Sequence, residues 1–216
     1  VLQFSPDLDL DQDLARGVTE VDTLASVIFG VTYDRADNRM DPHRGYKMMV
    51  SAEPTWVMDT EATFTRFWAE GRYYLPAGEG GVVAFRLRAG TLQGESPELV
   101  PITRRFYAGG PFSVRGYRHQ GLGPLSETGA LLGGNALFEA SAELRVALPR
   151  DLLGIFFADT GNAFTDWSAF RGENLYTSAG FGLRYQTPAG PLGLDIAFKL
   201  KEDPLDSSSF GIHFYI

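Results

Sequence analysis

The sequence predicts an all-β protein, specifically a transmembrane antiparallel β-barrel. Along most of the chain, segments of about ten residues alternate apolar and polar side chains, as strands between two different environments do. The polar face of these segments carries Arg, Glu and Asp of both signs, whereas the apolar face mixes Leu and Phe with Ala and Gly. Tight Pro/Gly turns also alternate with longer polar loops, which is the arrangement of bacterial outer-membrane barrels.

The composition argues against several other classes of protein. A content of 13% aromatic residues and 25 glycines fits a soluble domain poorly. No run approaches 18 apolar residues, so no transmembrane helix is expected. The chain has no Cys, which excludes disulfides and thiolate metal sites, and we expect neither a metal nor a cofactor. The net charge of -8 argues against nucleic acid as a partner.

Residues 1–23 are predicted to form an acidic extracellular loop, with a possible strand tail at its start. Four aspartates alternate here as in a calcium loop, but the Gly and the closing Glu of that motif are missing, so a solvated loop is the simpler interpretation. No signal peptide is recognisable at Val1, and we therefore expect the chain to be part of a longer protein. The aspartates are Asp7, Asp9, Asp11 and Asp13.

Residues 24–216 are predicted to form about nine barrel strands, four before the longest connection and five after it. Aromatic residues near the strand ends are candidates for an interfacial girdle. The predicted strands are Ala25–Asp34, Tyr46–Glu53, Thr63–Leu75, Gly80–Gly90, Ala136–Leu148, Leu153–Phe164, Tyr176–Thr187, Pro191–Lys201 and Ser209–Ile216. The candidate girdle residues are Trp56, Trp68, Tyr73, Phe164 and Trp167.

The longest connection, residues 91–131, is the main candidate for a functional element, because a loop of this length is uncommon in a compact domain. Its apolar content argues against a solvated linker. The segment Gly109–Tyr117 reads GGPFSVRGY, and its glycines permit the positive φ angles of a tight fold. Such a fold can aim Arg115, whose planar fork suits bidentate pairing with a carboxylate. The simpler alternative is a surface hairpin with a solvated Arg.

These motifs resemble the outer-membrane protein assembly barrels, the superfamily of BamA, TamA and the two-partner secretion transporters, also called the bacterial surface antigen family. The resemblance runs from about Leu24 to the end. It includes the loop signature Gly110, Val114, Arg115, Gly116 and Tyr117, together with Glu143 and the stretch Phe157–Phe164. The last strand is similar to the β-signal of such barrels, at Ser209, Gly211, Phe214 and Ile216, although the family usually ends on an aromatic residue.

The resemblance implies the carboxyl-terminal half of a sixteen-stranded barrel, integral to the bacterial outer membrane and in contact with its lipid. The signature loop would fold into the lumen, where Glu143 and Asp159 match the family's partners of Arg115. The implied function is insertion or translocation of unfolded β-barrel or autotransporter clients. The missing barrel half or a second copy would have to cover the open sheet edges, because unpaired edges are costly in lipid.

Two alternatives to an insertase remain open from the sequence, and a third is not expected. The chain could form a secretion pore of the two-partner type, or a passive channel or anchor of a larger fused protein. An enzyme is not expected, because His43, His119 and His213 are scattered and no catalytic or metal-binding spacing is present.

Overall fold

The computed structural model describes residues 23–58, 62–94, 100–187 and 190–215. These form one antiparallel sheet of ten strands with three short 3-10 helices in the connections. Within these ranges, no helix is long and apolar enough to cross a membrane. The strands are β1 (Leu24–Ser26), β2 (Phe29–Asp34), β3 (Gly45–Val57), β4 (Thr63–Pro76), β5 (Gly81–Gly94), β6 (Ala136–Leu148), β7 (Leu152–Phe164), β8 (Tyr176–Thr187), β9 (Gly190–Lys199) and β10 (Phe210–Tyr215). The helices are η2 (Ile102–Arg104), η3 (Trp167–Ala169) and η4 (Gly172–Asn174).

The predicted first strand is divided into β1 and β2, which both pair with β3 in the same register. The break lies opposite Pro54, which has no backbone N–H to donate to the ladder. Val27 N–H still donates to the Pro54 carbonyl at 3.2 Å, so the chain does not leave the sheet. The ten strands therefore fill nine positions, in agreement with the predicted number.

The predicted bounds of the long loop are wrong by several residues at each end. The ladder between β4 and β5 continues to the pair Phe64 and Gly94, so residues 91–94 belong to β5. At the other end β6 begins only at Ala136, because the segment from Phe106 to Asn135 makes its own backbone bonds inside the loop and to Leu92. Alternation of side chains could not locate these ends, since Gly and Thr carry little pattern at the boundary.

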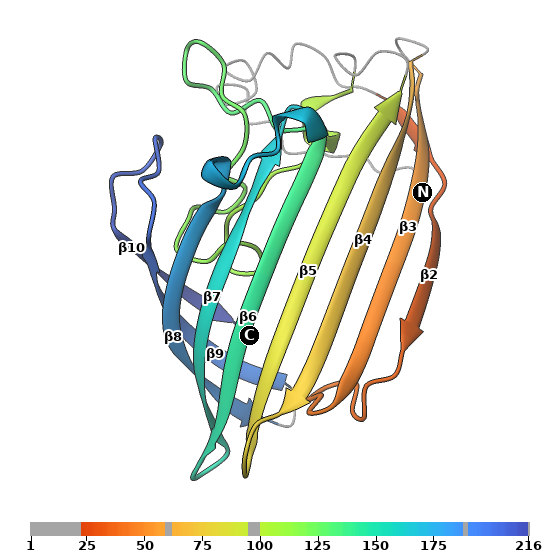
Figure 1. The fold of residues 1–216 in the computed structure, drawn as a ribbon. Helices are drawn as coiled ribbons and strands as arrows, with labels where there is room; N and C mark the ends of the chain where they lie inside the picture. The colour runs from red at the N-terminus through yellow and green to blue at the C-terminus, as the bar shows by residue number, and fades with distance from the viewer. Residues whose placement is uncertain (1–22, 59–61, 95–99, 188–189, 216) are drawn as a thin grey trace.

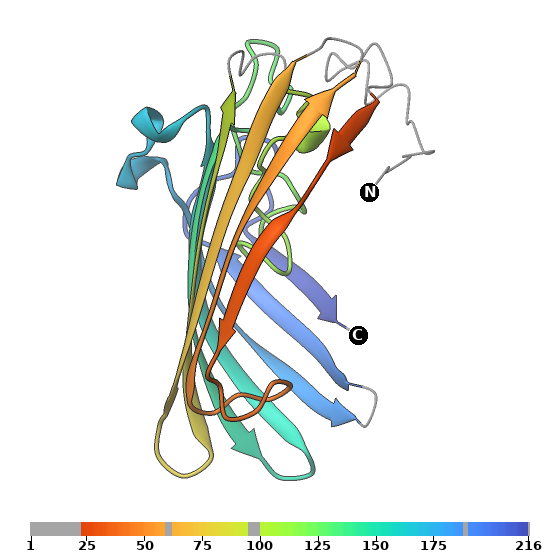
Figure 2. The same ribbon diagram turned by 90° about the vertical axis from the view of Figure 1, so that its right-hand side faces the viewer.

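The sheet is strongly curved, and much of the long loop folds onto its concave side, while another part of the loop projects beyond the ends of the strands (Figures 1 and 2). The concave side is called the lumen below. The long loop and the connections 165–175 and 200–209 gather at one end of the strands, and the connections 35–44, 77–80 and 149–151 lie at the other end (Figure 1). Among the described strands, β10 pairs only with β9, and β1 and β2 pair only with β3, so the sheet is an open half-barrel. Residues 188–189 between β8 and β9, the acidic segment 1–22 and Ile216 lie outside the described residues.

The distribution of side chains is inverted relative to a soluble protein. Large apolar side chains are exposed on the convex face along the strands, for example Met48, Phe85, Leu183 and Phe214. Charged side chains such as those of Glu139, Asp159 and Asp195 are buried on the lumen side. This inversion is what a barrel wall between lipid and an aqueous lumen requires.

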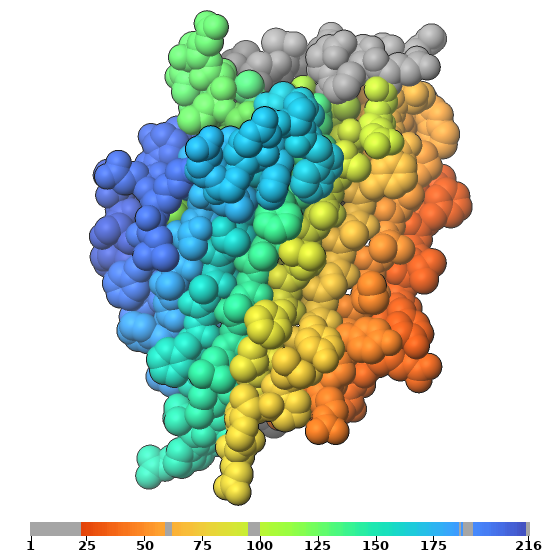
Figure 3. All heavy atoms as spheres, in the orientation of Figure 1, coloured from red at the N-terminus to blue at the C-terminus, as the bar shows by residue number. Residues whose placement is uncertain are grey.

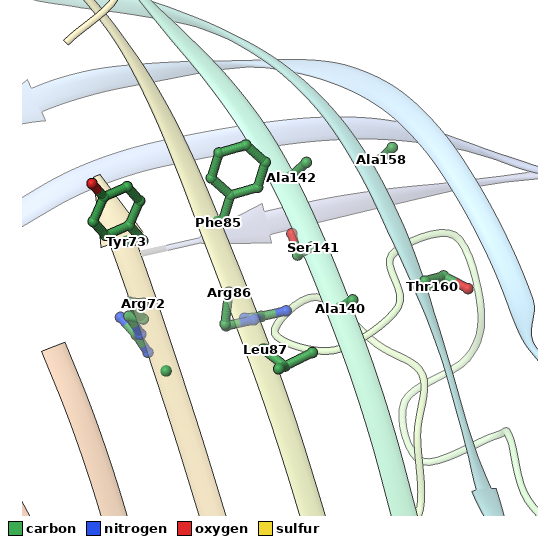
Figure 4. A pocket seen from close by; sticks show the side chains of 11 residues that line it. Arg72, Tyr73, Phe85, Arg86, Leu87, Ala140, Ser141, Ala142, Ala158 and Thr160 are labelled. Atoms are coloured by element: carbon green, nitrogen blue, oxygen red, sulfur yellow. The ribbon is translucent and has the colours of Figure 1, made fainter. Parts of the chain in front are cut away.

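A shallow hollow of about 440 Å³ lies on the convex face over the middle of β4–β7. Phe85 and Leu87 stand at its border and the small side chains of Ala140, Ala142 and Ala158 form its floor (Figure 4). The mixture of large and small residues on the apolar face, which is visible in the sequence, therefore makes the outer surface of the wall uneven.

The candidate aromatic girdle is only partly correct. Trp56, Tyr73 and Trp167 are exposed near strand ends. Phe164 is buried beneath Phe170 of the connection 165–175, with ring centroids 5.4 Å apart, and this connection spreads over the outer face of the strands in Figure 3. Trp68 faces the lumen and stacks on Phe106 of the loop at 6.1 Å, because the loop supplies apolar surface inside the barrel.

The loop builds the largest apolar core of the molecule inside the lumen. Val57, Phe64 and Leu92 from the strands pack with loop residues that include Phe106, Val114, Tyr117 and Leu122. Gly90 permits this contact, since a Cβ there would lie 2.6 Å from the Phe106 ring. The loop thus fills the lumen near the end of the strands where it is attached. This apolar packing fixes the position from which Arg115 reaches the wall.

The two faces of the wall predict opposite effects of a charge at neighbouring positions. Met48 points outward and is 55% exposed, whereas Met49 faces the lumen opposite Glu70. We expect Met48→Arg to lower the free energy of unfolding by up to about 2–4 kcal/mol, which is the cost of an Arg facing lipid at the bilayer midplane. Met49→Arg should cost much less, because a charge at this position stays on the polar lumen face and does not enter lipid. Refolding into phospholipid vesicles at increasing urea, followed by heat-modifiable gel mobility, measures both, and equal losses would contradict this assignment of faces.

Candidate functional site

The signature segment is a tight backbone turn that presents Arg115. Gly109, Gly110 and Gly116 have φ angles of 96°, 105° and 92°, which confirms that these positions use the left-handed region. Gly110 N–H donates to the Val114 carbonyl at 3.2 Å, and Ser113 N–H donates to the Gly110 carbonyl at 3.1 Å. These bonds close the turn, so the arginine that follows projects in a defined direction.

Arg115 lies in the lumen wall and makes a bidentate pair with Asp159 on β7. Its Nε donates to Oδ2 at 2.6 Å and its Nη2 to Oδ1 at 3.0 Å, and its backbone N–H also donates to Oδ2 at 3.2 Å. The Arg115 residue is 5% exposed and Asp159 only 1%. The solvated surface hairpin considered from the sequence is therefore wrong for this segment.

Two further carboxylates approach the same guanidinium. Nη1 donates to Glu143 Oε2 on β6 at 3.1 Å and to Asp195 Oδ2 on β9 at 3.0 Å. The structure thus brings together Arg115 and both sequence-predicted partners, and it adds Asp195, which was not among the predicted partners of the loop. Asp195 also accepts from Arg184 on β8, so the cluster joins four neighbouring strands.

The arginine cluster packs against an aromatic ring, and two glycines leave the space that it needs. The Arg115 guanidinium lies 3.4 Å from the centroid of the Phe157 ring, as in a cation–π contact. Gly180 on β8 leaves room for that ring, since a Cβ there would lie 2.5 Å from it. Gly182 leaves room for the Asp195 carboxylate, which a Cβ would overlap. Glycines on the polar face of the predicted strand were the one sequence feature that could have indicated a close approach here.

The neighbouring carboxylates keep the buried arginine protonated. Burial alone would lower the pKa of the Arg115 guanidinium, but hydrogen bonds and charge from Asp159, with the charges of Glu143 and Asp195, outweigh it and raise the pKa. Arg115 therefore stays charged, and removing it would leave buried carboxylates without their cation.

Two arginines of β5 hold the tip of the turn. Arg88 Nη1 donates to the Phe112 carbonyl at 2.6 Å and Arg86 Nη2 to the Ser113 carbonyl at 3.1 Å. The Ser113 hydroxyl accepts from Gly109 N–H at 2.7 Å and bonds to Glu139 on β6. The turn is thus bound both to β5–β6 and to β7–β9, and sequence inspection had not identified Arg86, Arg88 or Glu139 as its partners.

Tyr117 and Val114 are fully enclosed. The Tyr117 hydroxyl lies 2.8 Å from the Lys201 carbonyl and 3.0 Å from the Thr177 carbonyl, so it can donate to either. Its ring meets that of Tyr176 edge-on with centroids 5.5 Å apart. Tyr117 therefore anchors the end of the signature against β8 and the connection that follows β9.

The residues of the β-signal are divided between the two faces of the last strand. Ser209 precedes β10, and its carbonyl accepts from Lys199 N–H at 2.9 Å. Gly211 faces the lumen and touches Gly116 of the loop, whereas Phe214 points outward and is 77% exposed. Ile216 lies outside the described residues.

The sequence that forms this half-barrel and its inward loop also matches a known protein family. The sequence profile of the Omp85 superfamily domain covers residues 5–216. The chain belongs to the Omp85 superfamily. This agrees with the resemblance seen in the sequence.

Relatives of this Omp85 domain include the outer membrane protein assembly factor BamA of Neorickettsia risticii, which is 26% identical over 98% of the chain. A SAM50-like protein of Drosophila melanogaster is 28% identical over 74% of the chain. The domain spans 30% and 37% of the lengths of these two relatives. Its fold is similar to the crystal structure of BamA from Haemophilus ducreyi, with a TM-score of 0.71, 22% identity, and coverage of 88% of this chain and 42% of the other.

The arginine cluster predicts a graded response to substitution at position 115. Arg115→Ala should cost about 3–5 kcal/mol, the range for breaking a buried ion pair by removing one partner. The outer apolar face is untouched, so most strands should still fold. Arg115→Lys should recover only part of the loss, since a point charge cannot reproduce the bidentate fork. Thermal unfolding in detergent and protease sensitivity of the loop report these effects.

Arg118→Ala is the matched control for this series, because Arg118 is an exposed arginine of the same loop. It should leave both measurements near those of the unmodified protein. Full recovery by Arg115→Lys would show that charge alone holds the loop and that the fork geometry is unimportant.

The close approach at Gly182 gives an independent test of the cluster. Gly182→Ala should displace the Asp195 carboxylate and cost about 1–3 kcal/mol, as overpacking in a buried site does. Gly71→Ala is the control, because no atom lies within 4 Å of a Cβ added there. Unfolding midpoints of the two variants in the same detergent can be compared directly. Equal midpoints would contradict the crowded packing around Asp195.

Proposed function

We propose that this Omp85 domain is the carboxyl-terminal half of a bacterial outer-membrane barrel that assists the insertion of other β-barrel proteins. The names of its relatives, an outer membrane protein assembly factor and a SAM50-like protein, support this assignment. The domain covers only about a third of those relatives, so the proposal concerns the longer protein to which such a barrel half contributes.

The physical task of such a barrel is to shelter an unfinished strand. A client strand entering hydrocarbon carries unpaired N–H and C=O groups, each of which costs several kcal/mol. An exposed sheet edge can pair with those groups by strand addition. The described strands β2 and β10 are edges of this kind, since each has one neighbour in the described sheet.

The observation that carries the proposal is the arginine loop. Three carboxylates from three strands hold this long loop inside the wall through Arg115. A loop bound to both β5–β6 and β7–β9 keeps the curved wall in shape while its edges remain available. Other strands of the longer protein, or a second copy of this domain, must then complete the wall.

The proposal assigns no catalytic activity to the domain. Lipid of the outer membrane and unfolded barrel or autotransporter clients are its proposed partners. A secretion pore of the two-partner type and a passive channel or anchor use the same wall, and they differ from an insertase in what they do to a client.

Reconstitution of the full-length protein separates these functions. Proteoliposomes of phosphatidylethanolamine and phosphatidylglycerol receive a urea-unfolded eight-stranded barrel, and its folding is followed by heat-modifiable mobility. An insertase accelerates folding over empty liposomes, and Arg115→Ala slows it while Arg118→Ala does not. Ion conductance without acceleration would indicate a passive channel, and client found inside the vesicle lumen would indicate a secretion pore. Either result would refute the insertase.

A further inference from the structure

The signature loop also contacts the last strand, at a place separate from the arginine cluster. The backbone N–H of Gly116 donates to Nε2 of His213 on β10 at 2.8 Å. Two residues earlier on the same strand, Gly211 lies against the same loop residue, and a Cβ at position 211 would be 2.9 Å from the Gly116 carbonyl oxygen and 3.0 Å from its Cα. Two residues of β10 are therefore shaped to receive Gly116.

The hydrogen bond defines the state of the histidine. An amide N–H can only donate, so Nε2 of His213 must be the unprotonated acceptor and the imidazole is neutral with its proton on Nδ1. In the β9–β10 ladder His213 is paired with Asp195, which binds Arg115. The consecutive residues Arg115 and Gly116 thus bind β9 and β10 at one level of the sheet.

The strand that receives this contact is held weakly by the sheet itself. β10 comprises only Phe210–Tyr215 and pairs with β9 alone among the described strands. Its outward residues Phe210, Ile212 and Phe214 are exposed, so its lumen side carries its remaining contacts with the protein. A bond from the loop on that side adds to the stability of the strand in its register.

We propose that His213 is a positioning residue, which with Gly211 docks the arginine loop onto β10 and so couples the loop to the edge of the sheet. When the loop leaves, β10 loses its lumen-side partner and opens from β9. An opened β10 would leave an edge with which a client strand can pair, and this consequence rests on the proposed insertase function. The coupling of loop and strand does not rest on it.

Hydrogen–deuterium exchange on the full-length protein in detergent tests the coupling. His213→Ala should speed exchange of the amides in residues 210–215 about five- to tenfold, which is the effect of one lost buried hydrogen bond. Exchange in β4–β5 should be unchanged. Gly211→Ala should have a similar local effect, because the added Cβ pushes Gly116 away, while Gly71→Ala, with open space around its Cβ, should have none.

His213→Gln distinguishes docking from general packing. Its amide oxygen can accept the Gly116 N–H, so exchange in residues 210–215 should return towards that of the unmodified protein. Exchange in His213→Ala equal to the unmodified protein would overturn the proposal, and so would His213→Gln behaving like His213→Ala. If His213→Ala does not fold, the exchange of residues 210–215 in Gly211→Ala tests the coupling instead. Exchange equal to that of the unmodified protein would overturn the proposal.

The exchange measurement is independent of client insertion. If the unmodified protein fails to accelerate client folding but the exchange pattern holds, the proposed function is lost and the coupling stands. If client folding is accelerated but β10 exchanges equally in all variants, the coupling is lost and the insertase stands.

Discussion

The burial of one guanidinium among three carboxylates governs the arrangement of the lumen. Arg115 has to be desolvated to reach Asp159, Glu143 and Asp195, and this cost is met only because every carboxylate is placed by a different strand of a single curved wall. Register within the sheet therefore determines whether the loop can bind. In return, the bound loop joins strands that share no direct pairing, which stiffens an open half-barrel against flattening.

The wall itself separates two solvents. Its convex face presents large apolar side chains, and its relief comes from the contrast of Phe85 and Leu87 with alanines. Its concave face has an apolar core near one end, built by the loop around Phe106 and Tyr117, and salt-bridged charges below it. The apolar core positions the loop without directional bonds, and the charges then select its orientation. In a lumen that water can enter, apolar packing alone would not orient the loop, and ion pairs alone would not hold it in place.

The loop also links the cluster to the edge of the sheet. Tyr117 reaches the connection after β9, Gly116 contacts β10, and Arg115 binds β9, so three consecutive residues engage the terminal hairpin. An element that holds both the middle of the wall and its last strand can transmit a change at one to the other. The loop contacts thus favour the pairing of β10 with β9 until a partner strand competes for that edge strand.

Alternation of side chains by itself determined the class of fold, the nine sheet positions and the lumen placement of Glu143, because residues two apart on a strand must share a face. The glycines of the signature likewise indicated a tight turn, since few other residues accept a positive φ. Alternation could not determine that Asp195, Glu139 and His213 meet the loop, because their approach depends on sheet curvature and on register between strands distant in sequence. Alternation places Trp68 on the lumen face together with Glu70, but it could not show that the loop fills this part of the lumen and buries the ring against Phe106. Only the tertiary structure decided these points.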